Sequence, residues 1–212
     1  MRKSLVVVML AAGLAISGVS SADSQHGAVQ AAPGAQVVAT QMALRDLWVG
    51  HIFWVREVVD AMVAKDTGAI TVAEGRVVEN AKQIAGAIEP FYGPAASDQL
   101  FKLLAGHYTA IKEHAAATVA GTSGDAKQAA VKLSANAREI SAFLSKANPH
   151  LQQQTLNALL VAHGGHHLQQ NQQLAKGDRT AEARTWDEMR THIYSISDAL
   201  TAALAKQFPD KF

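Results

Sequence analysis

One pattern recurs three times in this 212-residue chain, and it restricts the possible folds more than any other feature. Each copy has leucine at its first and fourth positions, tryptophan or leucine at its fifth and histidine at its eighth. The copies lie at 44–51, 100–107 and 156–163, so each begins 56 residues after the one before. Self-similarity at a fixed period indicates an internal repeat of one structural unit.

The spacing within each copy is that of an α-helix. Leucines three or four residues apart and a histidine seven residues after the first leucine lie on one face of a helix. A second polar residue follows each histidine at a distance of 29 and is also surrounded by apolar positions. Six polar side chains are therefore expected to point into an apolar core: His51, Asn80, His107, Asn136, His163 and His192.

A turn signal lies midway between the two polar positions of every unit. The turns are Lys65-Asp66-Thr67-Gly68, Gly121-Thr122-Ser123-Gly124 and Lys176-Gly177-Asp178. Glycine beside aspartate or serine is typical of turns. Each unit is thus predicted to be an antiparallel pair of helices, with its two polar residues about 20 Å from the turn at about 1.5 Å per residue.

The composition from Val37 onward favours helices throughout, because Ala, Leu, Gln, Lys and Glu dominate it and strand patterning is absent. We place helices near 37–65, 69–89, 95–120, 125–147, 150–176 and 179–207. The prediction is an all-α domain over 37–212: a closed six-helix bundle made of three repeated antiparallel helical hairpins, at about 37–92, 93–148 and 149–207. An open solenoid is the alternative, but it would leave apolar end faces exposed.

The first 36 residues differ from the rest. Met1-Arg2-Lys3 is a short basic segment, Leu5 to Ile16 is an apolar run too short to span a bilayer, and Ser20-Ser21-Ala22 has the small residues of a cleavage site. Residues 1–22 are predicted to be a cleaved signal peptide and 23–36 a flexible lead-in. The mature protein is then expected in the periplasm or outside the cell, without stable membrane insertion.

Charge and the lack of cysteine exclude several classes of function. Loss of Arg2 and Lys3 would lower the 19 basic residues to 17, one fewer than the 18 acidic ones. The excess of basic residues that nucleic-acid binding needs is missing. Without cysteine there is no disulfide, no thiolate metal site and no covalently attached c-type haem.

The chain resembles a group of small all-helical bacterial proteins, mostly of unassigned function. The resemblance covers nearly the whole mature chain and is carried by Leu47-Trp48, His51, Trp54, Arg56, Asn80, Phe91-Tyr92-Gly93, His107, Asn136, Phe143-Leu144, Asn148-Pro149 and His163. It implies a helical fold and no established chemistry. The chain departs from the group at Gly164-Gly165-His166-His167, where ordinary helix formers are expected.

Two interpretations of the inward polar residues follow. Either a His51–Asn80 bond and a His107–Asn136 bond lock their hairpins in register, or the histidines hold a metal. Neutral imidazole is a common ligand for zinc, copper and nickel, and Asn80 and Asn136 would then orient the rings. The third unit fits the first interpretation poorly, since a histidine there faces a histidine.

The third unit carries additional ligand capacity. His163 and His167 are four residues apart and His163 and His166 three, both suited to chelating one ion. Gly164 and Gly165 each cost a helix about 1 kcal/mol relative to alanine, which suggests a close approach by another helix, a kink or a ligand. His114, seven residues after His107, is expected to extend the inner polar track.

We therefore expect an exported protein that binds one divalent transition metal (zinc, copper or nickel) for buffering, delivery or sensing. The expected ligands are His163, His167, His51, His107, His166 and His192, with affinity falling as the pH drops through the histidine range near about 6.5. The first alternative is a metal-dependent enzyme, because the pair at 163 and 167 with a third histidine resembles the site of DinB-type four-helix proteins. However, the apolar stripes offer no carboxylate, and no catalytic residue is predicted. The second alternative is a structural or partner-binding module with buried His–Asn pairs.

Overall fold

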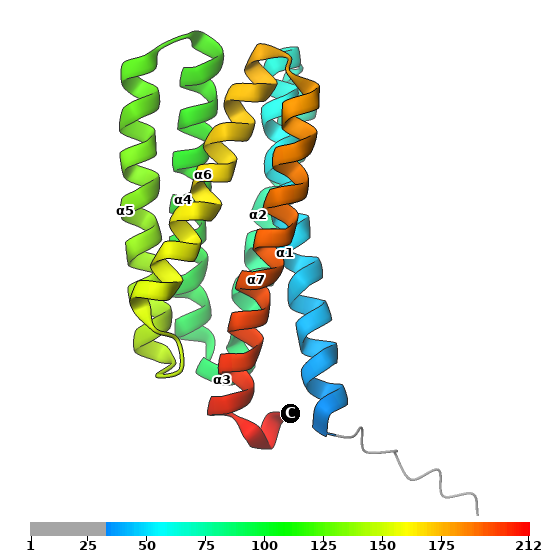
Figure 1. The fold of residues 1–212 in the computed structure, drawn as a ribbon, viewed down its shortest axis with the longest axis vertical. Coiled ribbons are helices and arrows are strands. Elements are labelled where there is room, and N and C mark those ends of the chain that lie inside the picture. Colours follow the sequence, from blue (N-terminus) through cyan, green and yellow to red (C-terminus); the bar gives the residue numbers. More distant parts are fainter. Residues whose placement is uncertain (1–32) are drawn as a thin grey trace, which may run out of the picture. The chain divides into compact units, whose positions relative to one another are not determined.

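The computed structural model describes residues 33–212, which form a bundle of helices (Figure 1). The long helices are α1 (Pro33–Ala64), α2 (Thr67–Gly86), α4 (Pro94–Ala120), α5 (Ser123–Ala147), α6 (Gln153–Lys176) and α7 (Arg179–Gln207). A four-residue helix α3 (Glu89–Tyr92) and a 3-10 turn η1 (Pro209–Lys211) complete this part of the chain. The expectation of an all-helical bundle with six helices is confirmed, and no strand occurs between residues 33 and 212.

The helix bounds differ from the predicted ones mainly at two places. Helix α1 already begins at Pro33, so the last four residues of the expected lead-in are helical; proline suits a first helical position because its missing N–H is not needed there. Helix α6 begins at Gln153, three residues late, because Asn148 Oδ1 accepts a hydrogen bond from the backbone N–H of His150 (2.8 Å) and holds a turn. The predicted signal peptide lies outside the described residues.

Three short turns join the paired helices at one end of the bundle, seen at the top of Figure 1. Lys65, Gly121 and Gly177 occupy the left-handed region, with φ of 56°, 76° and 71°, and these positions are 56 residues apart. Asp66 and Asp178 then cap α2 and α7 by accepting a backbone N–H three residues ahead. Glycine adopts this conformation without penalty, so Lys65 is the exception.

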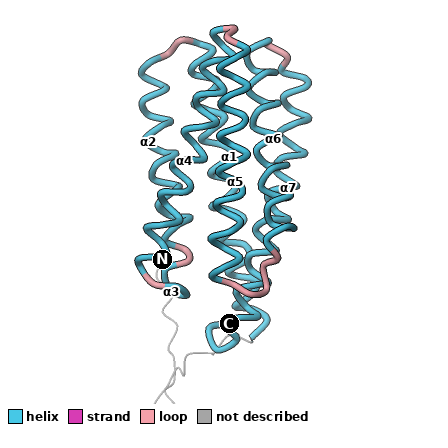
Figure 2. Tube along the Cα trace, turned by 90° about the vertical axis from the view of Figure 1, so that its left-hand side faces the viewer, coloured by secondary structure: helices cyan, strands magenta, loops and turns pink. Residues whose placement is uncertain are grey.

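The long helices run side by side along the bundle (Figure 2), and their contacts close a ring. Around it, α1 packs on α2, α2 on α4, α4 on α5, α5 on α6, α6 on α7 and α7 back on α1. Helices α1, α4 and α6 also pack on one another, so they lie innermost. The described helices thus close on themselves and do not form an open stack.

The apolar core has two main parts and a small third one made of Val59, Ala115 and Leu174. The larger part includes Trp48, Leu104 and Leu160 and extends to the end of the bundle where α3 lies. The smaller part includes Val58 and Ile111 and lies nearer the hairpin turns. The histidines of the repeated pattern fall between the two parts along the inner helices, so they are held from both sides by apolar packing.

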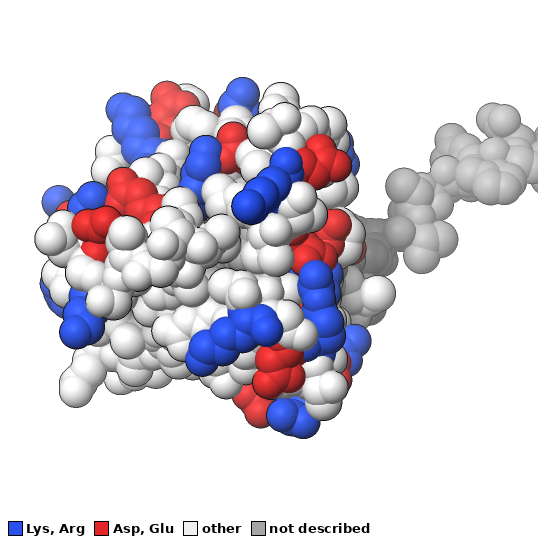
Figure 3. Space-filling view, turned by 90° about the horizontal axis from the view of Figure 1, so that it is seen from above, with Lys and Arg blue, Asp and Glu red and all other residues white. Residues whose placement is uncertain are grey.

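The outer surface is polar and mixed in charge. At the hairpin-turn end, basic and acidic side chains are interspersed, with no large area of one sign (Figure 3). Among the helices described, none combines the length and apolar character needed to cross a membrane.

Candidate metal centre

Four histidines meet in the middle of the bundle. His51 comes from α1, His107 from α4, and His163 and His167 from α6; one ring nitrogen of each lies within 4.8 Å of the corresponding nitrogens of the others. All four side chains are buried, and none is more than 4% exposed. We call these residues the four-histidine cluster.

Helix α6 supplies two members of the cluster because residues four apart share one helical face. The rings of His163 and His167 are edge to face with their centroids 4.6 Å apart. Gly164 lies between them where α5 approaches, and a Cβ added there would come within 3.2 Å of Leu133 Cδ2. Of the three causes considered for the two glycines, a close approach by another helix is found at Gly164, whereas Gly165 faces open space.

The asparagines predicted to orient the rings both bond to the preceding helix of their hairpin. Asn80 Nδ2 donates to the Leu47 carbonyl (2.9 Å), and Asn136 Nδ2 donates to the Leu103 carbonyl (3.0 Å). Sequence reasoning missed these bonds and the glycines that make room for them. A Cβ added to the glycine before His51 or His107 would lie 3.1 or 3.2 Å from the asparagine nitrogen, and the Gly-His pair in both copies was the available signal.

The predicted histidine–asparagine bonds form in only one hairpin. Asn136 Oδ1 lies 3.1 Å from His107 Nδ1. The expected His51–Asn80 bond was wrong, because Asn80 Oδ1 has no hydrogen-bond partner. The local difference is Trp48, whose ring packs edge-on against His51 with centroids 5.9 Å apart.

His166 and His192 were predicted as ligands, but the structure does not bring them to the cluster. They form a separate half-buried pair with ring centroids 5.2 Å apart. His192 Nε2 donates to the Leu159 carbonyl (2.8 Å), which is the bond that each asparagine makes in its own hairpin. His192 therefore takes the place of an asparagine and does not face His163.

The cluster is short of hydrogen bonds. Six of its ring nitrogens are buried without a partner: Nε2 of His51, Nε2 of His107, and both nitrogens of His163 and His167. Buried polar groups are normally paired. The cluster therefore has six positions at which a ligand-binding lone pair or N–H is unused.

The cluster is also neutral. Burial lowers the pKa of His51 to about 3, with the nearby His107 acting in the same direction. Burial lowers the pKa of His107 to about 4, against the opposing effect of its bond to Asn136. Burial, then the neighbouring rings, holds the pKa of His163 and of His167 well below 6.5. Neutral imidazole offers the lone pair that a metal ion requires.

The donor set fits a late transition metal. Zinc–nitrogen bonds of about 2.0–2.1 Å place tetrahedral ligands about 3.3 Å apart, so the present nitrogens, within 4.8 Å, need to draw together through ring rotation. The group contains only imidazole, the ligand that zinc, copper, nickel and iron accept. Calcium and magnesium, which require oxygen ligands, are excluded from this set.

A second layer of buried polar residues lies nearer the turns, about seven residues along the helices from the four-histidine cluster. His114 Nδ1 accepts from Asn171 Nδ2 (3.1 Å), and Gln170 Nε2 donates to Glu182 Oε1 (2.8 Å). Glu182 is also held by Arg56 through two bonds of 2.7 and 3.0 Å. We call these five residues the paired layer. Sequence reasoning singled out only His114, although Gln170 follows His163 by the same seven residues.

Comparison with known proteins found no matching family model, no matching curated protein and no matching solved structure.

Proposed function

We propose that this is an exported protein that binds one divalent transition metal, namely zinc, copper or nickel, through His51, His107, His163 and His167. Its role would be buffering, delivery or sensing of that metal. The observation that carries the proposal is the set of six buried ring nitrogens without partners in one cluster.

The energetics favour a ligand over a purely structural role. A buried polar group left without a partner costs about 1–3 kcal/mol, and a core that needed only packing would avoid several such groups side by side. A metal ion accepts the lone pairs of four rings at once. The same nitrogens that weaken the metal-free bundle would then stabilise the metal-bound one.

Four nitrogen ligands argue against the enzyme alternative. Catalytic zinc sites hold three protein ligands and keep one position for water or substrate, whereas four protein ligands close the site. The group contains no carboxylate to act as an acid or base. A DinB-like site uses three histidines and would leave the fourth buried ring without a metal to bind. Metal binding without catalysis therefore explains the four histidines better than an enzyme does.

The three hairpins are interpreted as copies of one unit. In each, an N–H of the later polar residue meets the carbonyl of a leucine 33 residues earlier, at Leu47, Leu103 and Leu159. Repetition of this bond supports the 56-residue repeat. His51, His107 and His163 occupy the same position in the three copies, whereas His167 is an additional ligand present only in the third.

Export rests on the sequence of residues 1–22, whose basic start, apolar stretch and small-residue end are those of a signal peptide. A periplasmic or secreted protein meets metal ions before the cytoplasm does. A buried, closed site in that compartment suits capture and hand-over of an ion.

Calorimetric titration of the chelator-stripped protein with zinc, copper(II) and nickel tests the proposal. We expect about one ion bound per chain for at least one metal, and a melting temperature that rises with its concentration because binding favours the folded state; at a hundredfold excess over Kd the gain is about 2.7 kcal/mol.

Matched variants locate the site. His163→Ala and His167→Ala are expected to abolish binding, while His166→Ala, next to His167 on the same helix but outside the cluster, should bind as the wild type does. Circular dichroism checks that each variant stays helical. Titrations without heat for all three metals, or binding that survives both cluster substitutions, would contradict the proposal.

A further inference from the structure

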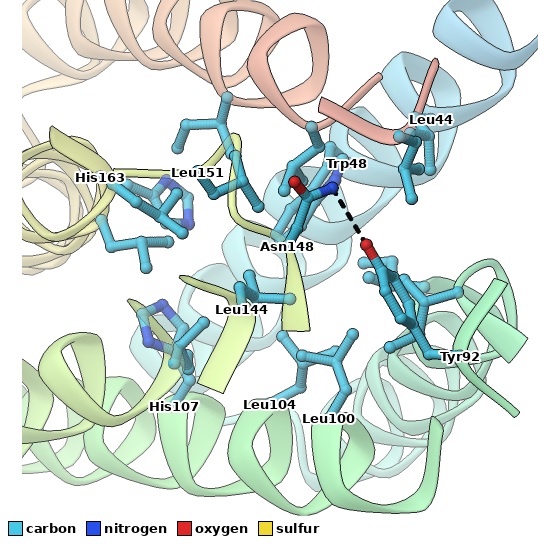
Figure 4. Close-up of a pocket in the computed structure, with 18 residues that line it drawn as sticks. Leu44, Trp48, Tyr92, Leu100, Leu104, His107, Leu144, Asn148, Leu151 and His163 are labelled. Carbon is cyan, nitrogen blue, oxygen red and sulfur yellow. Dashed lines mark hydrogen bonds between the residues drawn. The ribbon is translucent and has the colours of Figure 1, made fainter. Parts of the chain in front are cut away.

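A largely buried cavity of about 50 Å³ adjoins the four-histidine cluster. His107 and His163 form part of its wall, and the rest runs through the larger apolar core toward the end of the bundle opposite the hairpin turns. In Figure 4 the two histidines lie on one side of the cavity, and Tyr92 lies on the other.

The wall is almost entirely apolar, with leucine and isoleucine side chains from all six long helices. Cavities of this kind stay dry and take up apolar molecules. Trp48, His107 and His163 also line the cavity, and each has a buried ring nitrogen without a hydrogen-bond partner. The cavity therefore suits a small guest that is mostly apolar.

The size of the cavity limits the guest. One water needs about 10–15 Å³ of the same kind of volume, so about 50 Å³ holds a molecule of at most about three to five heavy atoms. Drug-sized ligands occupy about 300–1,000 Å³ and are excluded. Charged guests are excluded as well, since nothing in the wall carries an opposite charge.

The outer end of the cavity offers a route to solvent. Ile88, Leu151 and Leu200 line it there and are only partly buried. Beside them, Asn148 Nδ2 donates to the Tyr92 hydroxyl (3.0 Å), which in turn donates to Gln207 Oε1 (2.8 Å). These bonds join the segments that meet at this end, so opening them would admit a small molecule.

We propose that this cavity binds a small uncharged apolar molecule, such as a diatomic gas, and holds it against the His107 and His163 side of the metal site. The cavity is defined by the protein alone, but the place of the guest beside a metal rests on the function proposed above.

Xenon is the first probe, used on metal-free protein and followed by xenon-129 NMR. We expect saturable uptake of about one xenon atom per chain. Leu104→Ala, which enlarges the cavity, should raise the affinity several-fold, and Leu104→Phe, which fills it, should lower it several-fold. Val131→Phe adds the same ring at a 67% exposed position of α5 and should change nothing. Absence of uptake in both wild type and Leu104→Ala would overturn the cavity proposal.

Copper(II) then tests the position of the guest. In copper-loaded protein the paramagnetic ion should relax bound xenon strongly, whereas zinc-loaded protein should leave its relaxation unchanged. If titration shows that the protein holds copper and the relaxation of bound xenon is nevertheless unchanged, the guest does not lie beside the metal site. Failure of zinc, copper(II) and nickel alike to bind would instead refute the metal function while the cavity result stands.

Discussion

The bundle contains two buried polar layers one helical repeat apart, and they differ in how their polar atoms are satisfied. In the paired layer, His114 bonds to Asn171, and Glu182 bonds to both Arg56 and Gln170. In the four-histidine cluster, six ring nitrogens have no partner. Burial alone therefore does not explain the cluster, because the same helices satisfy their polar groups seven residues away.

This contrast separates two uses of a buried polar residue. The paired layer fixes how α1, α4, α6 and α7 pack, since each of its residues bonds to a residue on another helix. Six ring nitrogens of the cluster have no such partners, so they are available to bind a ligand. Such a difference can be measured, because unpaired and paired groups respond oppositely to removal.

The largest expected effect is the acid sensitivity of the metal-free protein. In the unfolded chain each histidine protonates near pH 6.5, whereas in the folded state the pKa of His51 is about 3 and that of His107 about 4. The unfolded state therefore binds more protons below about pH 6.5, and stability that is present above this pH is lost as the pH falls. Each ring contributes about 1.4 kcal/mol per pH unit, so four contribute about 5 kcal/mol per unit.

Urea unfolding followed by circular dichroism at pH 7.5, 6.5 and 5.5 checks this expectation. A free energy of unfolding that is constant over this range would contradict it. The sequence predicted that metal affinity falls as the pH drops through about 6.5 because the ligands become protonated. The lowered pKa values in the folded state move this direct competition to a lower pH. Within the folded protein the rings stay neutral well below that pH, so acid acts first through unfolding and only later through direct competition with the metal.

The next effect is breakage of the paired layer at Glu182, which is 3% exposed. Glu182→Ala leaves the Arg56 guanidinium and the Gln170 amide without their common acceptor, and we expect a loss of about 3 kcal/mol because breaking a buried ion pair typically costs about 3–5 kcal/mol. Urea titration gives the loss. Metal titration of the same variant should still show one ion, and loss of binding would show that the two layers are coupled.

The smallest effect is also the most direct comparison, because the same substitution in the two layers should have opposite signs. In metal-free protein at pH 8, His163→Leu removes two unpartnered nitrogens and should stabilise by about 1–2 kcal/mol. His114→Leu deprives Asn171 of a partner and should destabilise by a similar amount. Thermal unfolding of both variants measures the two changes in stability. If both substitutions destabilise the protein by a similar amount, the two layers do not differ in the way proposed.

Much of the fold could be predicted from the sequence because it depends on periodicity. The 56-residue spacing, the apolar faces and the turn residues determine six helices and their pairing. The same periodicity identifies which histidines face inward, so His51, His107 and His163 could be found, and the four-residue spacing added His167.

Periodicity does not decide which neighbour an inward side chain bonds to. The predictions that were wrong or missing concern such bonds. Ring rotation and the packing of Trp48 separate His51 from Asn80, although the sequence pattern around His107 and Asn136 is nearly the same. His192 was predicted as a ligand because it is histidine, yet what its position requires is an N–H donor for the Leu159 carbonyl. Glu182 was missed because its partner Arg56 is distant in sequence.

Closure of the ring has a consequence for the order of the chain. Helix α7 packs on α1, and Arg45 donates to both carboxylate oxygens of Asp198 (2.8 and 2.5 Å), so α7 adjoins α1 as directly as helices consecutive in the chain adjoin each other. The ring of helices consequently has no fixed starting point. A circularly permuted chain that begins at α4 or at α6 is expected to build the same ring around the same histidines.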